Sequence, residues 1–108
     1  MKEVPKVWGK EIWVANEPEY CGKLLHIRQG ACSSLHYHKV KKETFYCLSG
    51  AVMLEVGEAM LTLSPDTEPI IILPTVAHSF EGLIDSILLE VSTHHDDEDV
   101  VRLRESKC

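Results

Sequence analysis

The chain has 108 residues, of which 44% are hydrophobic and 26% are charged, a composition typical of a globular domain and too apolar for a disordered segment. Seventeen acidic residues against eleven basic ones give a net charge of -6, which argues against nucleic acid or an anionic membrane as a partner. The first residues contain no apolar signal segment and the longest aliphatic run, residues 70–73, is too short to span a membrane, so we expect one cytoplasmic domain over residues 1–108.

Short aliphatic or alternating runs recur every ten residues or so, and alternation with a period of two is the pattern of half-buried strands. Turn residues such as Gly30, Gly50 and Gly57 separate the runs, which favours an antiparallel barrel or sandwich. The sequence therefore predicts an all-β fold with its core at about 23–92 and with strands at 12–15, 23–28, 34–38, 44–48, 51–56, 70–73, 78–80 and 86–92.

Two terminal segments and the cysteines complete this interpretation. The first fifteen or so residues are predicted to be loose, with Trp8 and Trp13 packing either on their own barrel or on a neighbouring subunit. The acidic segment that begins with His94 and His95 is predicted to be a solvated tail rather than a second metal site. No Cys-x-x-Cys pair is present, so we expect reduced thiols and, at Cys47, a small buried hydrophobe without a catalytic role.

The segment between Gly30 and Gly50 contains the spacing that points to chemistry. Successive side chains of a strand alternate between its two faces, so His36 and His38 point the same way and can present two imidazoles to one metal ion. If the chain reverses at residues 39–42, the carboxylate of Glu43 lies beside them at the start of the returning strand. The lysines at this reversal, at positions 39, 41 and 42, are interpreted as solubilising residues of a hairpin tip, with a basic rim for a sugar phosphate as the alternative.

A fourth ligand is expected from His78, which follows an aliphatic strand and a turn. Three nitrogens and one carboxylate oxygen suit one divalent ion of zinc, manganese, iron or nickel. For the octahedral ions, four protein ligands leave two positions open, as catalysis requires. The predicted metal ligands are therefore His36, His38, Glu43 and His78.

Residues 30–50 fill every position of the pattern G-x5-H-x-H-x4-E-x6-G, which resembles the first cupin motif, and residues 74–78 resemble the second. In the second motif Thr75 stands where glycine is usual, and no asparagine follows His78 at the usual place. The resemblance implies a double-stranded β-helix, or jelly-roll barrel, with a bound metal and commonly a homodimeric assembly. Segments 6–11, 20–23, 35–39 and 90–94 are similar to small cupins related to type II mannose-6-phosphate isomerase, which implies a carbohydrate as the small-molecule substrate.

The leading hypothesis is a sugar or sugar-phosphate isomerase-like enzyme in which the metal acts as a Lewis acid. Glu90 interrupts an aliphatic run, so it faces either water or the metal, and in the second case it is the candidate general base. Lys42 and His26 are the other candidates for this role. The alternatives are an iron-dependent dioxygenase, a noncatalytic small-molecule binding or sensing module, and a cupin that has lost its metal and keeps its histidines as hydrogen-bonded core residues.

Overall fold

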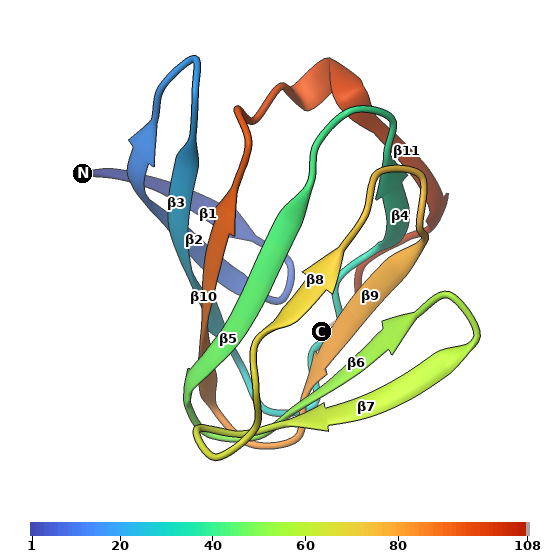
Figure 1. The fold of residues 1–108 in the computed structure, drawn as a ribbon. Helices are drawn as coiled ribbons and strands as arrows, with labels where there is room; N and C mark the ends of the chain where they lie inside the picture. The colour runs from blue at the N-terminus through green and yellow to red at the C-terminus, as the bar shows by residue number, and fades with distance from the viewer. Residues whose placement is uncertain (108) are drawn as a thin grey trace.

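The protein, seen here as a computed structural model that describes residues 1–107, consists of two antiparallel sheets that face each other (Figure 1). One sheet has the strand order β1-β2-β3-β10-β5-β8, and the other has the order β11-β4-β9-β6-β7. The strands are β1 (Lys2–Lys6), β2 (Gly9–Asn16), β3 (Cys21–Ile27), β4 (Leu35–His38), β5 (Glu43–Ser49), β6 (Val52–Val56), β7 (Ala59–Leu63), β8 (Ile70–Ile72), β9 (His78–Gly82), β10 (Ser86–Ser92) and β11 (Val100–Arg104). A short 3-10 helix, η1 (Asp97–Asp99), precedes β11.

The predicted all-β fold is confirmed, and each of the eight predicted strands is present with bounds that differ from the expected ones by at most three residues. Three further strands, β1, β7 and β11, were not expected. All three lie at the edges of the two sheets, and most of their side chains are exposed or only partly buried. An edge strand has no second neighbour to bury its side chains, so its hydrophobic alternation is weak.

The prediction of a loose N-terminal segment is wrong. Trp8 is only 4% exposed, and its ring meets that of Phe80 edge to face with 5.0 Å between centroids, so it packs on its own barrel. Strands β1 and β2 pair in register and extend the larger sheet beyond β3. Trp13, on β2, lies between the ammonium groups of Lys2 and Lys23.

The space between the sheets is apolar at one end and polar at the other. Strand β3 turns Leu25 and Ile27 inward at the apolar end, where Leu88 and Cys47 complete the same layer. Cys47 belongs to this apolar cluster, in agreement with its expected role as a small buried hydrophobe. At the other end the same alternation turns charged side chains inward, and the strand register brings Lys23 opposite Glu90.

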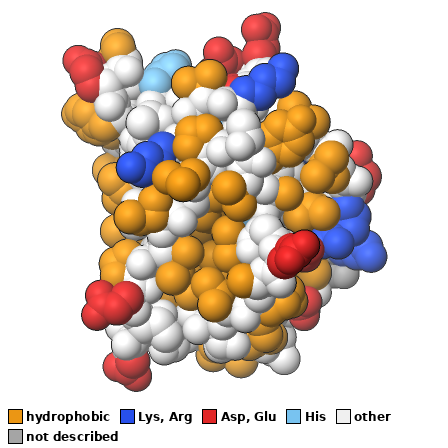
Figure 2. Space-filling view, turned by 45° about the vertical axis from the view of Figure 1, so that its right-hand side comes forward, with side chains coloured by type: hydrophobic (Ala, Val, Ile, Leu, Met, Phe, Trp, Pro, Cys, Tyr) orange, Lys and Arg blue, Asp and Glu red, His pale blue; other side chains and the backbone are white. Residues whose placement is uncertain are grey.

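The outer surface combines charged and apolar regions. Figure 2 shows hydrophobic side chains gathered across the middle of one face, with charged side chains mainly toward its periphery. Ile71, Leu73 and Val91 are among the large hydrophobic residues that are more than half exposed. None of the elements within residues 1–107 is a helix with the length and apolarity that crossing a membrane requires.

A candidate metal centre at the base of a charged cavity

Three imidazole rings converge at the polar end of the barrel. His36 and His38 lie on the same face of β4, and His36 is the cross-strand partner of His78 at the start of β9. The ring nitrogens available as ligands on these three residues all lie within 4.8 Å of one another. The structure thus brings together, from strands β4 and β9, the three histidines that the sequence predicts as ligands.

Glu43 begins β5 and points its carboxylate at the same cluster. Its Oε2 atom lies 2.9 Å from Nε2 of His78, and its Oε1 atom lies 3.6 Å from Nε2 of His38. The two atoms of the 2.9 Å contact are both buried, and neither has a hydrogen-bond partner with acceptable geometry within residues 1–107. Buried polar atoms are rarely left in this state, and two atoms that approach closely without forming a hydrogen bond are placed as joint ligands of a metal ion would be.

In two of the three histidines the other ring nitrogen is held by the backbone, whereas Nδ1 of His38 is buried without a hydrogen-bond partner within residues 1–107. Nδ1 of His78 lies 3.0 Å from the carbonyl oxygen of Val76, and Nδ1 of His36 lies 3.0 Å from that of Ser34. A carbonyl oxygen only accepts hydrogen bonds, so each Nδ1 carries the proton and each Nε2 keeps its lone pair for a ligand. Such contacts fix the orientation of metal-binding histidines, and here the chain supplies them without a metal.

The protonation states of His36, His38 and Glu43 also suit a cation. Burial, reinforced by the neighbouring imidazoles, lowers the pKa of His36 to about 3, and burial lowers that of His38 to about 4, so both are neutral near pH 7. Burial raises the pKa of Glu43, but contact with His78 and the charge of Lys41 outweigh this effect and lower it to about 2. The carboxylate therefore stays ionised, and it raises the pKa of His78 in spite of burial.

The turn before His78 has an unusual backbone. Thr75 has a positive φ of 71°, in the left-handed region that favours glycine, and its N–H donates to the carbonyl oxygen of His38 at 2.6 Å. This finding explains why glycine is the usual residue at this position of the second motif. At Gly50, which closes the first motif, a Cβ atom would lie 2.7 Å from the carbonyl oxygen of Asp85, so glycine is required there.

Residues 39–42 are not the hairpin tip that the sequence predicted, because β4 and β5 belong to different sheets and the turn between them crosses from one sheet to the other. Lys41, within this turn, is not a solubilising residue. Lys39 and Lys42 are exposed, but Lys41 is 3% exposed and turns its ammonium group inward. Its Nζ atom lies 2.6 Å from Glu90 and 3.3 Å from Glu43. Strict alternation explains the difference, because Lys41 shares its parity with Glu43 on the strand that follows.

Glu90 faces inward, which resolves the two orientations left open by the sequence. Burial, together with the charge of Glu43, raises its pKa. Lys41 is held charged, since the carboxylates of Glu90 and Glu43 outweigh the effect of burial and raise its pKa. The two other candidates for a general base do not lie at the cavity, because Lys42 is exposed and His26 faces a groove on the outside of the larger sheet.

The acidic segment after β10 is not a solvated tail. Its His95 turns Nδ1 toward the ammonium of Lys41 at 2.9 Å, and the side chain of Asp99 accepts hydrogen bonds from the backbone N–H groups of residues 39–41. His94 is exposed, and neither histidine joins the three-imidazole cluster. The segment thus packs on the turn between β4 and β5, the strands that carry three of the four predicted ligands.

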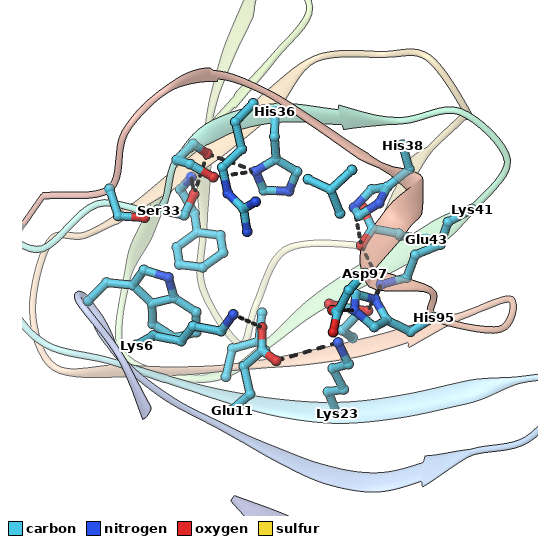
Figure 3. Close-up of a pocket in the computed structure, with 18 of the residues that line it drawn as sticks. Lys6, Glu11, Lys23, Ser33, His36, His38, Lys41, Glu43, His95 and Asp97 are labelled. Carbon is cyan, nitrogen blue, oxygen red and sulfur yellow. Dashed lines mark hydrogen bonds and ion pairs between the residues drawn. The ribbon is translucent and has the colours of Figure 1, made fainter. Parts of the chain in front are cut away.

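A cavity of about 270 Å³ opens above the imidazole cluster (Figure 3). His36, His38 and Glu43 lie at one side of it, while Glu11 and Lys23 enter from strands β2 and β3 at the opposite side. Its charged walls consist of the cations Lys6, Lys23, Lys41 and Arg102 and the carboxylates Glu11, Glu43, Glu90 and Asp97. Sequence reasoning missed Glu11 and Lys23, although the period-two pattern of β3, in which Cys21, Lys23, Leu25 and Ile27 share one face, contained the signal.

Comparison with solved structures identifies the architecture. An RmlC-like cupin from Shewanella frigidimarina superposes with a TM-score of 0.75 at 17% sequence identity, over 82% of this chain and 78% of the other. The chain has a cupin fold. Similar superpositions are found with KdgF from Halomonas sp. (TM-score 0.75, 21% identity, 82% and 81% of the two chains) and with a variant of PAC13 from Streptomyces with uridine (TM-score 0.78, 15% identity, 96% and 84%). No protein-family model matches the chain, and none of the curated proteins matches it either.

Proposed function

We propose that this cupin binds one divalent ion of zinc, manganese, iron or nickel through His36, His38, Glu43 and His78, and that it acts on a carbohydrate as an isomerase-like enzyme. The observation that carries the proposal is the close contact of Glu43 with His78, in which two buried ligand-type atoms approach to 2.9 Å without a hydrogen bond. A bound ion would satisfy both atoms. In the reaction it would supply Lewis-acid polarisation of a sugar carbonyl oxygen.

The cavity supports a small polar substrate. Its volume of about 270 Å³ is at the lower end of ligand pockets, which favours a single sugar unit over an oligosaccharide. Lysine, glutamate and histidine side chains offer hydrogen-bond donors and acceptors on opposite walls, and sugar hydroxyl groups need both. PAC13, which shares the fold, has been solved with uridine, a molecule that contains a ribose.

Glu90 is the proposed base. Interconversion of an aldose and a ketose moves one proton from C2 to C1 and one from the C2 hydroxyl to the C1 oxygen, with no net change in composition. A carboxylate whose pKa is raised toward neutral pH can take the C2 proton and return it to C1. Lys41, at 2.6 Å, holds Glu90 in place and balances its charge before proton transfer.

Two features outside the cavity enter the proposal. The hydrophobic side chains gathered on the face seen in Figure 2 support a homodimer, because an exposed hydrophobic patch commonly forms part of a protein–protein interface. The free thiols of Cys21, Cys32 and Cys47 support a cytoplasmic location, where cysteines stay reduced. Cys108 lies outside the described residues.

A noncatalytic binding function is the second candidate. The 2.6 Å ion pair with Lys41 and a further contact with the hydroxyl of Ser92 leave Glu90 already engaged by the protein. A Glu90 carboxylate that is held by these partners is consistent with a structural role, in which it maintains the shape of the cavity. In that case the protein would bind its ligand without turnover.

The test is to load the protein with each of the four metals and incubate it with a panel of aldoses and aldose phosphates. We expect ketose formation in one metal form, lost on Glu90→Gln while metal content is unchanged. Sugar binding without turnover in every metal form would support the noncatalytic function instead. Oxygen consumption by the iron form on addition of substrate would identify a dioxygenase and refute the isomerase proposal.

A further inference from the structure

The cavity wall opposite the imidazole cluster contains a buried ammonium group that the proposed chemistry does not use. Lys23 is 1% exposed, and it enters the cavity from β3. Within residues 1–107 its Nζ atom makes one hydrogen bond, at 3.5 Å, to Oε1 of Glu11. An ammonium has three donors, and burying a charge with so little compensation costs free energy.

The neighbours of Lys23 hold it in place without neutralising it. Its Nζ atom lies 4.2 Å from the centroid of the Trp13 ring, in a cation–π contact that adds no negative charge beside the ammonium. Glu11 is shared, because its Oε1 atom also accepts a hydrogen bond from Trp13 at 2.9 Å and its Oε2 atom lies 3.9 Å from Lys6. Two lysines thus face one carboxylate.

The cross-strand partner of Lys23 is engaged elsewhere. Glu90 lies opposite Lys23 in the strand register, but its carboxylate approaches Lys41 to 2.6 Å. Over the whole lining, four cationic side chains face four carboxylates, so a divalent ion on the imidazole cluster would leave the cavity with a positive excess. Such a cavity favours a ligand that is itself negatively charged.

We propose that Lys23 is an anion-binding residue, and that the ligand of this cavity is a sugar with a carboxylate or phosphate group. This inference deepens the proposed function and rests on it for the sugar. Figure 3 shows Lys23 on the side of the cavity opposite His36, so the anionic group would lie at one end of the ligand and the carbonyl at the other. The subsite would therefore select both the class of sugar and its direction in the cavity.

The experiment compares three probes that share one ring, namely glucose, glucuronate and glucose 6-phosphate. Binding is followed by the fluorescence of Trp8, which lines the cavity, and of Trp13, which contacts Lys23, and by calorimetry. We expect wild-type protein to bind at least one of the two anions about tenfold or more tightly than glucose, as a buried charge-assisted hydrogen bond implies. Whichever of the two anions binds more tightly shows whether the ligand is a sugar acid or a sugar phosphate.

Two variants and a control assign the preference to Lys23. Lys23→Met keeps most of the buried stem and is expected to remove the preference for anions, with the thermal melt reporting whether it folds. Glu11→Gln removes the carboxylate that competes for the ammonium and is expected to tighten anion binding. Lys10→Met removes an exposed lysine that pairs with Glu3 outside the cavity and is expected to change nothing.

The titrations are made with and without zinc, so that this inference and the proposed function are decided separately. Absence of metal binding in wild-type protein would refute the proposed metal centre, while the anion preference is still read in metal-free protein. A preference that survives Lys23→Met, or no tighter binding of either anion than of glucose, would overturn the anion subsite whatever the metal result.

Discussion

Thr75 donates its backbone N–H to the carbonyl oxygen of His38 at 2.6 Å, and this bond ties the turn before His78 to the end of strand β4. The turn achieves this with a positive φ at a β-branched residue. Two of the predicted metal ligands are thus positioned by one strained residue. Strain of this kind persists where the surrounding structure fixes it.

The strain at Thr75 predicts a stabilising substitution. Thr75→Gly should raise the free energy of unfolding by about 1 kcal/mol, because the relief of left-handed strain exceeds the added entropy of an unfolded glycine. Thr75→Ala, which removes the β-branch but not the Cβ atom, should give a smaller gain. Denaturation in urea measures both, and a Thr75→Gly variant less stable than wild type would show that φ is not strained there.

Substitution of Asp99, which is far from the imidazole cluster in sequence, is predicted to destabilise the protein. Its carboxylate accepts hydrogen bonds from three successive backbone N–H groups of the turn at 39–41, so Asp99→Ala should lower the free energy of unfolding by about 2 kcal/mol. Glu98→Ala, at the neighbouring exposed residue, is the matched control and should be nearly neutral. Equal effects of the two substitutions on the urea midpoint would rule out this anchoring role.

The sequence predicted the cluster itself but not its surroundings, for a physical reason. His36, His38 and Glu43 lie within eight residues of one another, on strands β4 and β5, which face each other in different sheets across one short turn. Their meeting therefore depends on local alternation and one chain reversal, both of which can be read from spacing. The contact of Lys41 with His95 joins residues 54 positions apart and depends on how the chain after β10 folds back. Long-range packing of this kind decides whether a polar segment is solvated or buried, and composition does not show it.

The ion pair of Lys41 with Glu90 predicts a non-additive pair of substitutions. Lys41→Met leaves Glu90 and Glu43 buried without their cation, so it should lower the free energy of unfolding by about 3 kcal/mol. Adding Glu90→Gln should recover part of this loss, since one of the uncompensated charges is then removed. Additive losses in the double variant, measured by urea denaturation, would mean that the two side chains are not coupled.

The histidine pKa values predict how the stability of the metal-free protein changes with pH. In the folded protein the pKa values of His36 and His38 are about 3 and about 4, below the ordinary value. As the pH falls through 6.5, the unfolded chain therefore binds protons at these two residues while the folded protein does not. His78, whose pKa is raised, is protonated in both the folded and the unfolded state below about pH 6, so it adds little to this difference. Because the unfolded chain binds nearly two more protons, stability should fall by about 2 kcal/mol per pH unit between about pH 6 and pH 5.

Denaturation of metal-free protein at a series of pH values measures this slope. The variant His36→Gln removes one of the two groups with a lowered pKa and should flatten it. Below pH 4.5 the loss should continue, because the unfolded chain then also protonates Glu43, whose folded pKa is about 2, while His38, with a pKa of about 4, becomes protonated in the folded protein as well. Stability that is constant or rises from pH 6 to pH 5 would contradict the neutral, buried state of the two histidines.

The central claim is that three imidazoles and one carboxylate form a single metal site, and metal content tests it most directly. Wild-type protein purified without added metal, then dialysed against zinc or manganese, should hold about one ion per chain, and His78→Gln should reduce the affinity at least about a hundredfold. A matched substitution of His94, which is exposed and outside the cluster, should leave the affinity unchanged. A wild-type chain that retains no ion, or a His78→Gln variant that binds as tightly as wild type, would contradict the account.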